Sequence, residues 1–320
     1  MMELGFDAHG PALSALQERR GTGRDPGPGE VRVRMRYAPI NPADLNLIAG
    51  TYGVRPALPA CAGLEGVGEV VAVGADAALA VGDLVRPADG LGTWRTEATA
   101  AASRFQRLPR IADLVQAAML AVNPATAWCL LDLVPLAPGA RILVNGAGSN
   151  LGRCLIAFAR ERGLRVVAQA RRAEALRDEL SRLGAEAVVG EGRADLHGIG
   201  GAVLAVNQVG GDAAAAQLKV LAPGATQVTV GGLARQPITV GAGQLIFADI
   251  RLRGFWITRW YAEQPASAVE AMLASLTARV ADGRLRQPVA AVIPLSRWRD
   301  ALAADAVAGR AGKVVLDCQA

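Results

Sequence analysis

The sequence predicts an α/β protein in which a β-rich domain is joined to a domain with a doubly wound parallel sheet. Three observations lead to this expectation. The chain of 320 residues is long enough for about two domains. Its first part shows short strands of period two between turns. Its middle part alternates continuous apolar strands with helices, which is typical of a sheet covered on both faces.

The β-rich part begins with residues 31–37, where valine, methionine and tyrosine alternate with arginine after a Gly/Pro turn. Residues 66–74 and 81–87 are predicted to form two further strands. Short strands with a turn every dozen residues indicate an antiparallel domain. The tail 289–317 has a strand–helix–strand pattern, and we expect it to return to this domain, because an edge pair must cover its apolar face.

The pattern changes near Leu114, where a helical stretch begins that is interrupted at Asn123 and Pro124. The following residues predict, in order, strand 140–145, helix 151–163, strand 164–172, helix 173–184, strand 185–190, strand 201–210, helix 213–224 and strand 226–232. Residues 250–258 are predicted to form one more strand, and 266–283 a long amphipathic helix. We therefore place one domain at 1–120 and 265–320, and the other at 121–264.

The composition and charge of the chain disfavour several classes of function. The net charge is +5, almost all from dispersed arginines, since Lys219 and Lys313 are the only lysines. This disfavours nucleic-acid binding and suits a small anionic ligand. The four cysteines are far apart, which indicates reduced thiols in a cytoplasmic protein rather than disulfides or a zinc knuckle. We expect no signal peptide and no membrane span.

A glycine-rich turn, NGAGSNLG, places Gly146, Gly148 and Gly152 between a predicted strand and helix. Such a turn can hold a pyrophosphate at the helix N-terminus, or it can simply be a tight connection, since its spacing is not G-x-G-x-x-G. Arg171 and Arg172 stand where NAD enzymes place a carboxylate for the ribose 2′-hydroxyl. Two guanidinium groups suit a 2′-phosphate, so we favour NADPH over two solvated arginines.

Metal and nucleophile chemistry find little support in the sequence. His9 and His197 are far apart, the cysteines are scattered, and there is no G-x-S-x-G elbow. Proton chemistry then falls to Glu65 or to Tyr52. Glu65 could equally be a buried structural carboxylate paired with an arginine. Tyr52 could be a structural loop residue, or a donor turned toward a cleft by Gly50 and Gly53.

At these residues the chain resembles the medium-chain dehydrogenase/reductase superfamily, and within it the zinc-independent trans-2-enoyl-CoA/ACP (2-enoyl thioester) reductase branch. The matching segments are NPADLNLIAGTYG, LPACAGLEGVGEVVAVG, GLGTWRTEA, VNPATAW, VTVGGLARQP and LIFADIRLRGFWITRW. The zinc-using members carry Cys and Gly-His-Glu ligands where this chain reads NPADLN and GLEG. The resemblance implies a GroES-like catalytic domain, a Rossmann domain and no metal.

The resemblance also implies roles for particular residues. Tyr52 would be catalytic, and the residues that contact NADPH would be Asn123, Gly148, Ser149, Asn150, Leu151, Arg171, Arg172, Val230, Gly231, Gly232, Leu233, Phe255, Trp256, Ile257, Thr258 and Lys313. The chain departs from the family pattern at Leu64, where a small or polar residue is usual. It departs again at Asn150, where glycine is frequent, and at Val230, where tyrosine is frequent.

The implied reaction is the NADPH-dependent reduction of an enoyl thioester of CoA or acyl carrier protein. A tyrosine hydroxyl can stabilise the enolate oxygen or donate a proton, because its ordinary pKa of about 10 keeps it protonated at neutral pH. Two alternatives stay open: an NADPH:quinone oxidoreductase, and a non-catalytic NADPH-binding protein. If strand 250–258 lies at a sheet edge, two copies could pair there as a homodimer.

Overall fold

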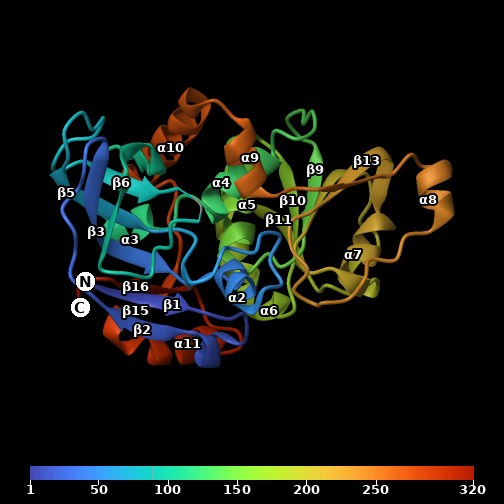
Figure 1. Ribbon diagram of the computed structural model, residues 1–320. Helices are drawn as coiled ribbons and strands as arrows, with labels where there is room; N and C mark the ends of the chain where they lie inside the picture. Colours follow the sequence, from blue (N-terminus) through green and yellow to red (C-terminus); the bar gives the residue numbers. More distant parts are fainter. Residues whose placement is uncertain (89) are drawn as a thin grey trace. The chain divides into compact units, whose positions relative to one another are not determined.

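The computed structural model describes residues 1–88 and 90–320, and the chain divides into two compact units. Unit 1 contains Met1–Val122 and Gln264–Ala320, and unit 2 contains Asn123–Glu263. Unit 1 is rich in strands, and unit 2 surrounds a parallel sheet with helices (Figure 1). The predicted α/β fold class is therefore confirmed.

Unit 1 contains, within the described residues, a seven-stranded sheet of order β15-β16-β3-β5-β6-β8, with β7 paired to β3, and a three-stranded sheet of order β2-β1-β4. Its strands are β1 (Met2–Phe6), β2 (Gln17–Arg20), β3 (Glu30–Pro39), β4 (Ala60–Cys61), β5 (Val67–Val73), β6 (Leu84–Pro87), β7 (Glu97–Ala101), β8 (Phe105–Arg107), β15 (Val289–Pro294) and β16 (Lys313–Asp317). Its helices are α1 (Ala12–Ala15), α2 (Pro42–Ala49), α3 (Leu114–Ala117), α10 (Ala266–Ala281) and α11 (Trp298–Ala306), with 3-10 turns at Ala102–Arg104 and Leu295–Arg297.

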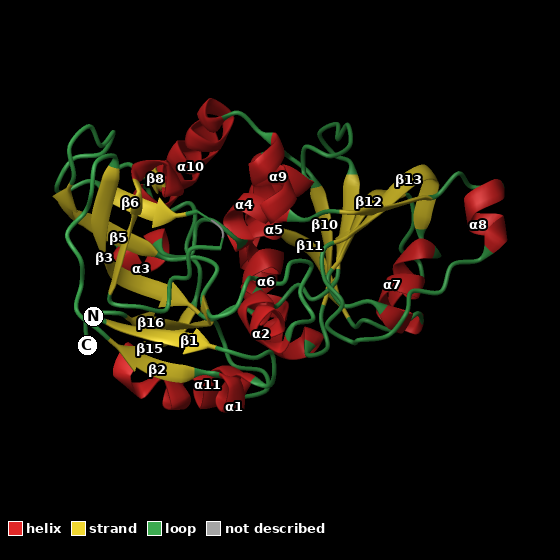
Figure 2. Cartoon of the chain, in the orientation of Figure 1, coloured by secondary structure: helices red, strands yellow, loops and turns green. Residues whose placement is uncertain are grey.

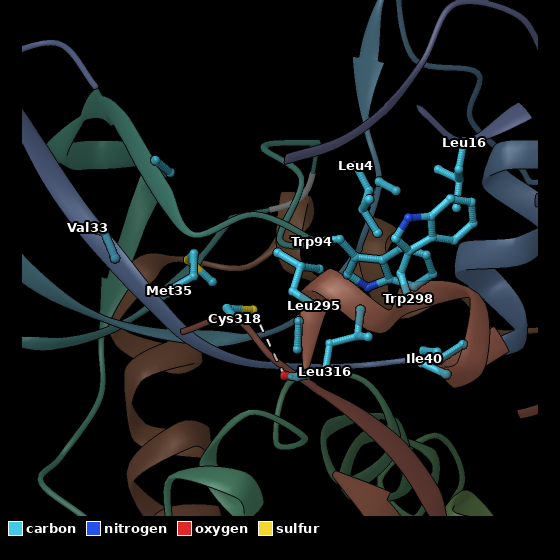
Figure 3. Close-up of a cluster of buried hydrophobic side chains, with 14 of the residues drawn as sticks. Leu4, Leu16, Val33, Met35, Ile40, Trp94, Leu295, Trp298, Leu316 and Cys318 are labelled. Atoms are coloured by element: carbon cyan, nitrogen blue, oxygen red, sulfur yellow. Dashed lines mark hydrogen bonds between the residues drawn. The ribbon is translucent and has the colours of Figure 1, made fainter. Parts of the chain in front are cut away.

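The C-terminal tail returns to unit 1, as expected. Strand β16 pairs antiparallel with β3, so that Val315 lies opposite Pro39, and β15 pairs with β16 in parallel. The apolar faces of these strands meet a buried cluster in which Figure 3 shows Trp94 and Trp298 among Leu4, Ile40 and Leu316. Burying side chains of this size stabilises the unit by roughly 1.5–3 kcal/mol each. The cluster thereby fixes the end of β3, where the chain enters α2.

Unit 2 contains, over the described residues, a six-stranded sheet of order β11-β10-β9-β12-β13-β14, in which every pair is parallel. Its strands are β9 (Arg141–Val144), β10 (Arg165–Gln169), β11 (Ala185–Val189), β12 (Ala202–Asn207), β13 (Leu221–Thr229) and β14 (Arg251–Gly254). Its helices are α4 (Asn123–Leu130), α5 (Asn150–Glu161), α6 (Ala173–Leu183), α7 (Gly211–Leu218), α8 (Ala242–Ile246) and α9 (Ile257–Glu263), with a 3-10 turn at Ala194–Leu196. The strand order reverses at β9, which is where open α/β sheets bind ligands. Figure 2 draws the strands of this sheet in yellow and the helices in red.

Two predicted elements end earlier than expected. The strand predicted at 250–258 stops at Gly254, and Ile257 begins helix α9 instead. The reason is its neighbour: Gly254 pairs with Thr229, the last residue of β13, so no partner remains for a longer strand. The helix predicted at 213–224 ends at Leu218, because the residues from Leu221 onward join β13.

No helix among the described residues is long and apolar enough to cross a membrane.

Candidate active site

The carboxyl edge of the parallel sheet in unit 2 brings most of the predicted cofactor residues together. Gly148, Ser149, Asn150 and Leu151 follow β9, and Arg171 and Arg172 follow β10. The segment 230–233 follows β13, and 255–258 follows β14. Because parallel strands end at one edge, residues far apart in sequence share this edge. Asn123 instead begins α4, and Tyr52 and Lys313 belong to unit 1.

The glycine-rich turn after β9 has a backbone that leaves little room for side chains. Gly146 has φ of 58°, and a Cβ at Gly152 would lie 2.5 Å from the Ala147 carbonyl oxygen, so helix α5 could not start so close with a larger residue. The Ser149 hydroxyl caps α5 by accepting the Gly152 N–H at 2.9 Å. Within the described residues the N–H groups of Gly148 and Leu151 have no acceptor. They are donors that an anion could use.

The two arginines after β10 line an open cleft of about 630 Å³. Arg171 and Arg172 are exposed, and Ala173, Gly190 and Asp195 complete much of the lining. Strand β10 itself ends in Gln169, so no carboxylate stands at the position that binds a ribose 2′-hydroxyl in NAD enzymes. The guanidinium groups fit a phosphate there, which meets the chemical requirement for a 2′-phosphorylated dinucleotide.

A carboxylate does lie at this edge, but it follows β11. Glu191 accepts the Gly146 N–H at 3.1 Å. Burial raises the pKa of Glu191, while this hydrogen bond and the charge of Arg171 act in the opposite direction. Glu191 is therefore bonded to the glycine turn and lies within the electrostatic influence of Arg171.

The segments after β13 and β14 are hydrogen-bonded to the rest of the edge. The Phe255 N–H donates to the Thr229 carbonyl at 3.0 Å, and the Val230 N–H donates to the Asn207 carbonyl at 2.9 Å. Ile257 is buried, while Val230, Phe255 and Trp256 are half-buried.

In unit 1, Tyr52 lies on a turn that follows α2. Gly50 ends the helix with φ of 73°, and a Cβ there would lie 2.8 Å from Cγ of His9, so glycine is required on both counts. The N–H groups of Thr51 and Tyr52 both donate to the Asn46 carbonyl, at 2.9 and 3.1 Å. Gly53 does not have a positive φ, so only Gly50 performs the turning role expected of both glycines. The Tyr52 side chain is half-buried.

A buried polar cluster anchors the other end of α2. Asp44 is fully buried, and its carboxylate accepts the N–H of Asn41 and the N–H of Leu64, both at 2.7 Å. Glu65, which is 1% exposed, accepts from Asn41 Nδ2 at 2.8 Å and from the Val122 N–H at 2.9 Å. These bonds join the start of α2, the turn at Leu64 and the last residue of the first segment of unit 1.

Lys313 supplies the cation of this cluster. Its ammonium donates to the Ile40 carbonyl at 3.2 Å and to Asn41 Oδ1, and the residue is 7% exposed. Glu65 thus belongs to a buried network, with Asn41 between it and the lysine, and the alternative of a pair with an arginine is wrong. Its contacts are those of a structural carboxylate. A cofactor contact for Lys313 stays a prediction.

The pKa values of the charged groups in this cluster differ from their ordinary values. Burial raises the pKa of Asp44 and the pKa of Glu65 to about 7 each, and it lowers the pKa of Lys313. The lysine charge opposes the rise of both carboxyl pKa values. Among the described residues, no group of three or more His, Cys, Asp or Glu side chains could hold a metal ion.

These pKa values predict a pH dependence of stability. A carboxyl whose pKa is raised on folding contributes stability below its unfolded pKa and loses it as the pH rises through the folded pKa, here from about 4 to about 7. We expect the two carboxyls together to lower the free energy of unfolding by on the order of 5 kcal/mol between pH 5 and pH 8, and Glu65→Gln to remove about half of this slope. Chemical denaturation across that range measures both. An equal slope in the variant and the wild type would contradict the assignment to Glu65.

Several residues of the edge escaped the sequence analysis. Asn145 follows β9, and Asn207 ends β12, and both are fully buried. Gln208, the next residue, is 5% exposed. A polar amide at the end of a continuous apolar strand was a usable signal, because such a residue reaches the ligand edge of a parallel sheet. Asp44 gave no comparable signal.

Comparison with known proteins agrees with this architecture. Residues 27–107 match the alcohol dehydrogenase GroES-like domain, and residues 151–275 match the zinc-binding dehydrogenase family. The fold and the site therefore define a medium-chain dehydrogenase/reductase, a superfamily that uses NAD(P)H.

Relatives within this superfamily narrow the assignment. The mouse (Mus musculus) mitochondrial enoyl-[acyl-carrier-protein] reductase is 40% identical over 288 residues, which cover 86% of this chain and 77% of that protein. The solved complex of Etr1p with NADP and crotonyl-CoA is 26% identical, with a TM-score of 0.89 and 99% of both chains covered. A Bacillus thuringiensis structure described as a candidate NADPH:quinone reductase is 29% identical, with a TM-score of 0.89 over 99% of this chain and 98% of that one. This chain belongs to the enoyl thioester reductase branch of the medium-chain dehydrogenase/reductases.

Proposed function

We propose that this chain reduces the double bond of a trans-2-enoyl thioester of CoA or acyl carrier protein, with NADPH as the electron donor. The arginine-lined cleft beside the glycine turn carries the cofactor part of this proposal. The acyl carrier protein substrate is the one named for relatives 40% identical to the chain, and the CoA thioester follows the solved Etr1p complex with crotonyl-CoA.

The reaction needs a group that stabilises the negative charge on the thioester oxygen and a group that gives a proton to the α-carbon. When bound, the reduced nicotinamide supplies a hydride to the β-carbon of the enoyl group, and the electron pair of the double bond moves onto the thioester oxygen. The hydroxyl of Tyr52 would donate a hydrogen bond to that oxygen, or a proton to the α-carbon, which completes the saturated acyl chain. The backbone that carries the phenol is bonded to the Asn46 carbonyl, and the Tyr52 side chain is half-buried.

The proposed cofactor residues divide by the part of NADPH they would hold. Backbone N–H groups of residues 148–151 would bind the pyrophosphate, and Arg171 with Arg172 the 2′-phosphate. The nicotinamide half would lie against Asn123 and the segments 230–233 and 255–258. Lys313, at the start of β16, is the last of the residues proposed to contact NADPH.

The double variant Arg171→Ala/Arg172→Ala tests the cofactor preference. We expect its Kd for NADPH to rise about 100-fold, because two charge-assisted contacts are lost, while its Kd for NADH changes by no more than about threefold. Fluorescence titration with both nucleotides measures this. Arg165→Ala, at the opposite end of β10, is the matched control. Equal weakening for NADPH and NADH would show that the arginines do not read the 2′-phosphate.

The reaction itself is tested by NADPH oxidation with crotonyl-CoA and, separately, with a simple quinone. Turnover with the thioester supports the proposal. The second candidate is an NADPH:quinone oxidoreductase, favoured by the likeness to the Bacillus thuringiensis structure, and turnover with the quinone alone would establish it. Tight NADPH binding without turnover on either would favour a non-catalytic role.

We also propose that the chain is a homodimer. Strand β14 lies at the edge of the six-stranded sheet, and its residues Arg251–Gly254 are all exposed. An exposed edge can pair with a second copy about a two-fold axis. We expect sedimentation to give twice the chain mass of 33.1 kDa. A single species at the monomer mass down the whole concentration series would refute it.

We propose a cytoplasmic location for the protein. The relatives are named mitochondrial, whereas the reduced thiols of this chain suit a cytoplasmic protein equally well.

A further inference from the structure

A chain of side-chain hydrogen bonds runs along the carboxyl edge of the unit 2 sheet, and Gln208 lies at its centre. The Ser149 hydroxyl donates to Gln208 Oε1 at 2.8 Å. Gln208 Nε2 donates to the Asn145 carbonyl at 2.7 Å, and the Gln208 N–H donates to Asn145 Oδ1 at 2.6 Å. One glutamine therefore contacts both ends of the glycine-rich turn that follows β9.

The same series of hydrogen bonds continues toward β13. Asn145 Nδ2 donates to Asn207 Oδ1 at 2.8 Å, and Asn207 Nδ2 donates to Thr229 Oγ1 at 3.1 Å. The Gln208 carbonyl accepts the Leu233 N–H at 3.2 Å. A Cβ at Gly231 would lie 2.8 Å from that carbonyl oxygen, so the two segments approach closely. Gln208 is thus bonded to the turn after β9 and to the segment after β13.

The contact with Ser149 determines how that serine can act. Its oxygen accepts the Gly152 N–H at 2.9 Å, and its hydrogen is given to Gln208. With both groups engaged, the hydroxyl cannot rotate, and the cap of α5 is held in one geometry. The backbone donors of Gly148 and Leu151, on either side of Ser149, are then held in place for an anion before it arrives.

We propose that Gln208 is a positioning residue for the dinucleotide: by holding the Ser149 hydroxyl and the Asn145 backbone, it keeps the phosphate turn in its binding geometry. This inference rests on the proposed cofactor site and assigns a role there to a residue outside the predicted set. Gln208 need not touch the ligand. Since the turn would hold the pyrophosphate, loss of the Gln208 side chain should weaken binding of the whole dinucleotide and spare a fragment that has only the 2′-phosphate.

A second buried glutamine provides a matched control. Gln217 is fully buried in the same unit, and its side chain bonds to Gln169 at 2.9 Å and to Gln227 at 3.1 Å. None of its side-chain bonds reaches the glycine turn or the 230–233 segment. Gln217→Leu therefore measures what any lost buried amide costs in stability, without the proposed effect on the turn.

The experiment uses the full chain and two probes. NADPH is titrated by fluorescence, and adenosine 2′-monophosphate, which lacks the pyrophosphate, is measured as a competitor. In Gln208→Leu we expect the Kd for NADPH to rise about tenfold and the Ki for adenosine 2′-monophosphate to stay within about twofold. Gln217→Leu should leave both constants unchanged, although its melting temperature falls.

Variants of Ser149, the other partner in this hydrogen bond, test the same contact, and they serve if Gln208→Leu does not fold. Ser149→Ala should weaken NADPH binding, and Ser149→Thr, which keeps the hydroxyl, should restore most of it. In the double variant Gln208→Leu/Ser149→Ala, the effects should be clearly less than additive, because both changes remove one contact.

Three results would overturn the inference: an NADPH Kd in Gln208→Leu within twofold of the wild type, equal weakening of both probes, or fully additive effects. Ser149→Ala at wild-type NADPH affinity would overturn it where Gln208→Leu cannot be purified. A wild-type chain that binds no NADPH would instead refute the proposed function.

Discussion

Replacing Tyr52 with phenylalanine is expected to lower kcat on crotonyl-CoA by about 100-fold or more, with little change in the Kd for NADPH. The substitution removes one oxygen and keeps the ring, so the turn after α2 should survive: its bonds to the Asn46 carbonyl come from the backbone. What is lost is the donor for the developing enolate charge or for the α-carbon proton. Removing one such donor typically costs 100- to 1,000-fold in turnover.

The control for this experiment is Tyr37→Phe. Tyr37 lies within strand β3 and is half-buried, so its variant loses a phenol of the same chemistry from the sheet of unit 1. Steady-state kinetics with NADPH and crotonyl-CoA compare the two variants. Turnover of Tyr52→Phe at the level of Tyr37→Phe would remove Tyr52 from the chemistry and leave it as a loop residue. A parallel loss of NADPH affinity would indicate that the turn had collapsed.

The parallel sheet of unit 2 was predictable from sequence, because strands covered on both faces become continuous apolar runs, as in Arg141–Val144 and Ala202–Asn207. The glycine turn and the two arginines were predictable for a related reason. Each directly follows such a strand, and the strand alone carries it to the ligand edge.

The role of Gln208 could not be derived in the same way. It depends on β12 lying beside β9, a pairing between segments about sixty residues apart that periodicity does not encode. The end of β14 at Gly254 is similar, since it is set by where β13 stops. Sequence patterns therefore gave the elements and their ligand-facing ends, whereas contacts across strands required the structure.

The buried cluster beneath α2 shows the same limit and leads to the second large effect. Glu65 was a candidate for proton chemistry until the structure placed it at 1% exposure, with both carboxylate oxygens accepting hydrogen bonds. The partners come from Asn41 and Val122, and the nearby cation comes from β16 at the far end of the chain. Asp44, Glu65 and Lys313 are thus charged groups from three distant segments, buried together.

Lys313→Met is therefore expected to destabilise the protein by about 3–5 kcal/mol, because it leaves two buried carboxyl groups without their cation and Asn41 Oδ1 without its donor. Chemical denaturation at pH 8 measures this loss. Lys219→Met is the matched control: it removes the only other lysine, which is exposed at the end of α7, and should cost less than about 0.5 kcal/mol.

The pH dependence of this loss separates electrostatics from packing. Burial raises the pKa of Asp44 and that of Glu65 to about 7, so at pH 5.5 both carboxyls hold protons and need the cation less. The destabilisation by Lys313→Met should accordingly shrink at pH 5.5, and adding Glu65→Gln should recover part of it at pH 8. A loss of equal size at both pH values would mean that Lys313 stabilises unit 1 through its methylene chain, and the charge argument would then be wrong.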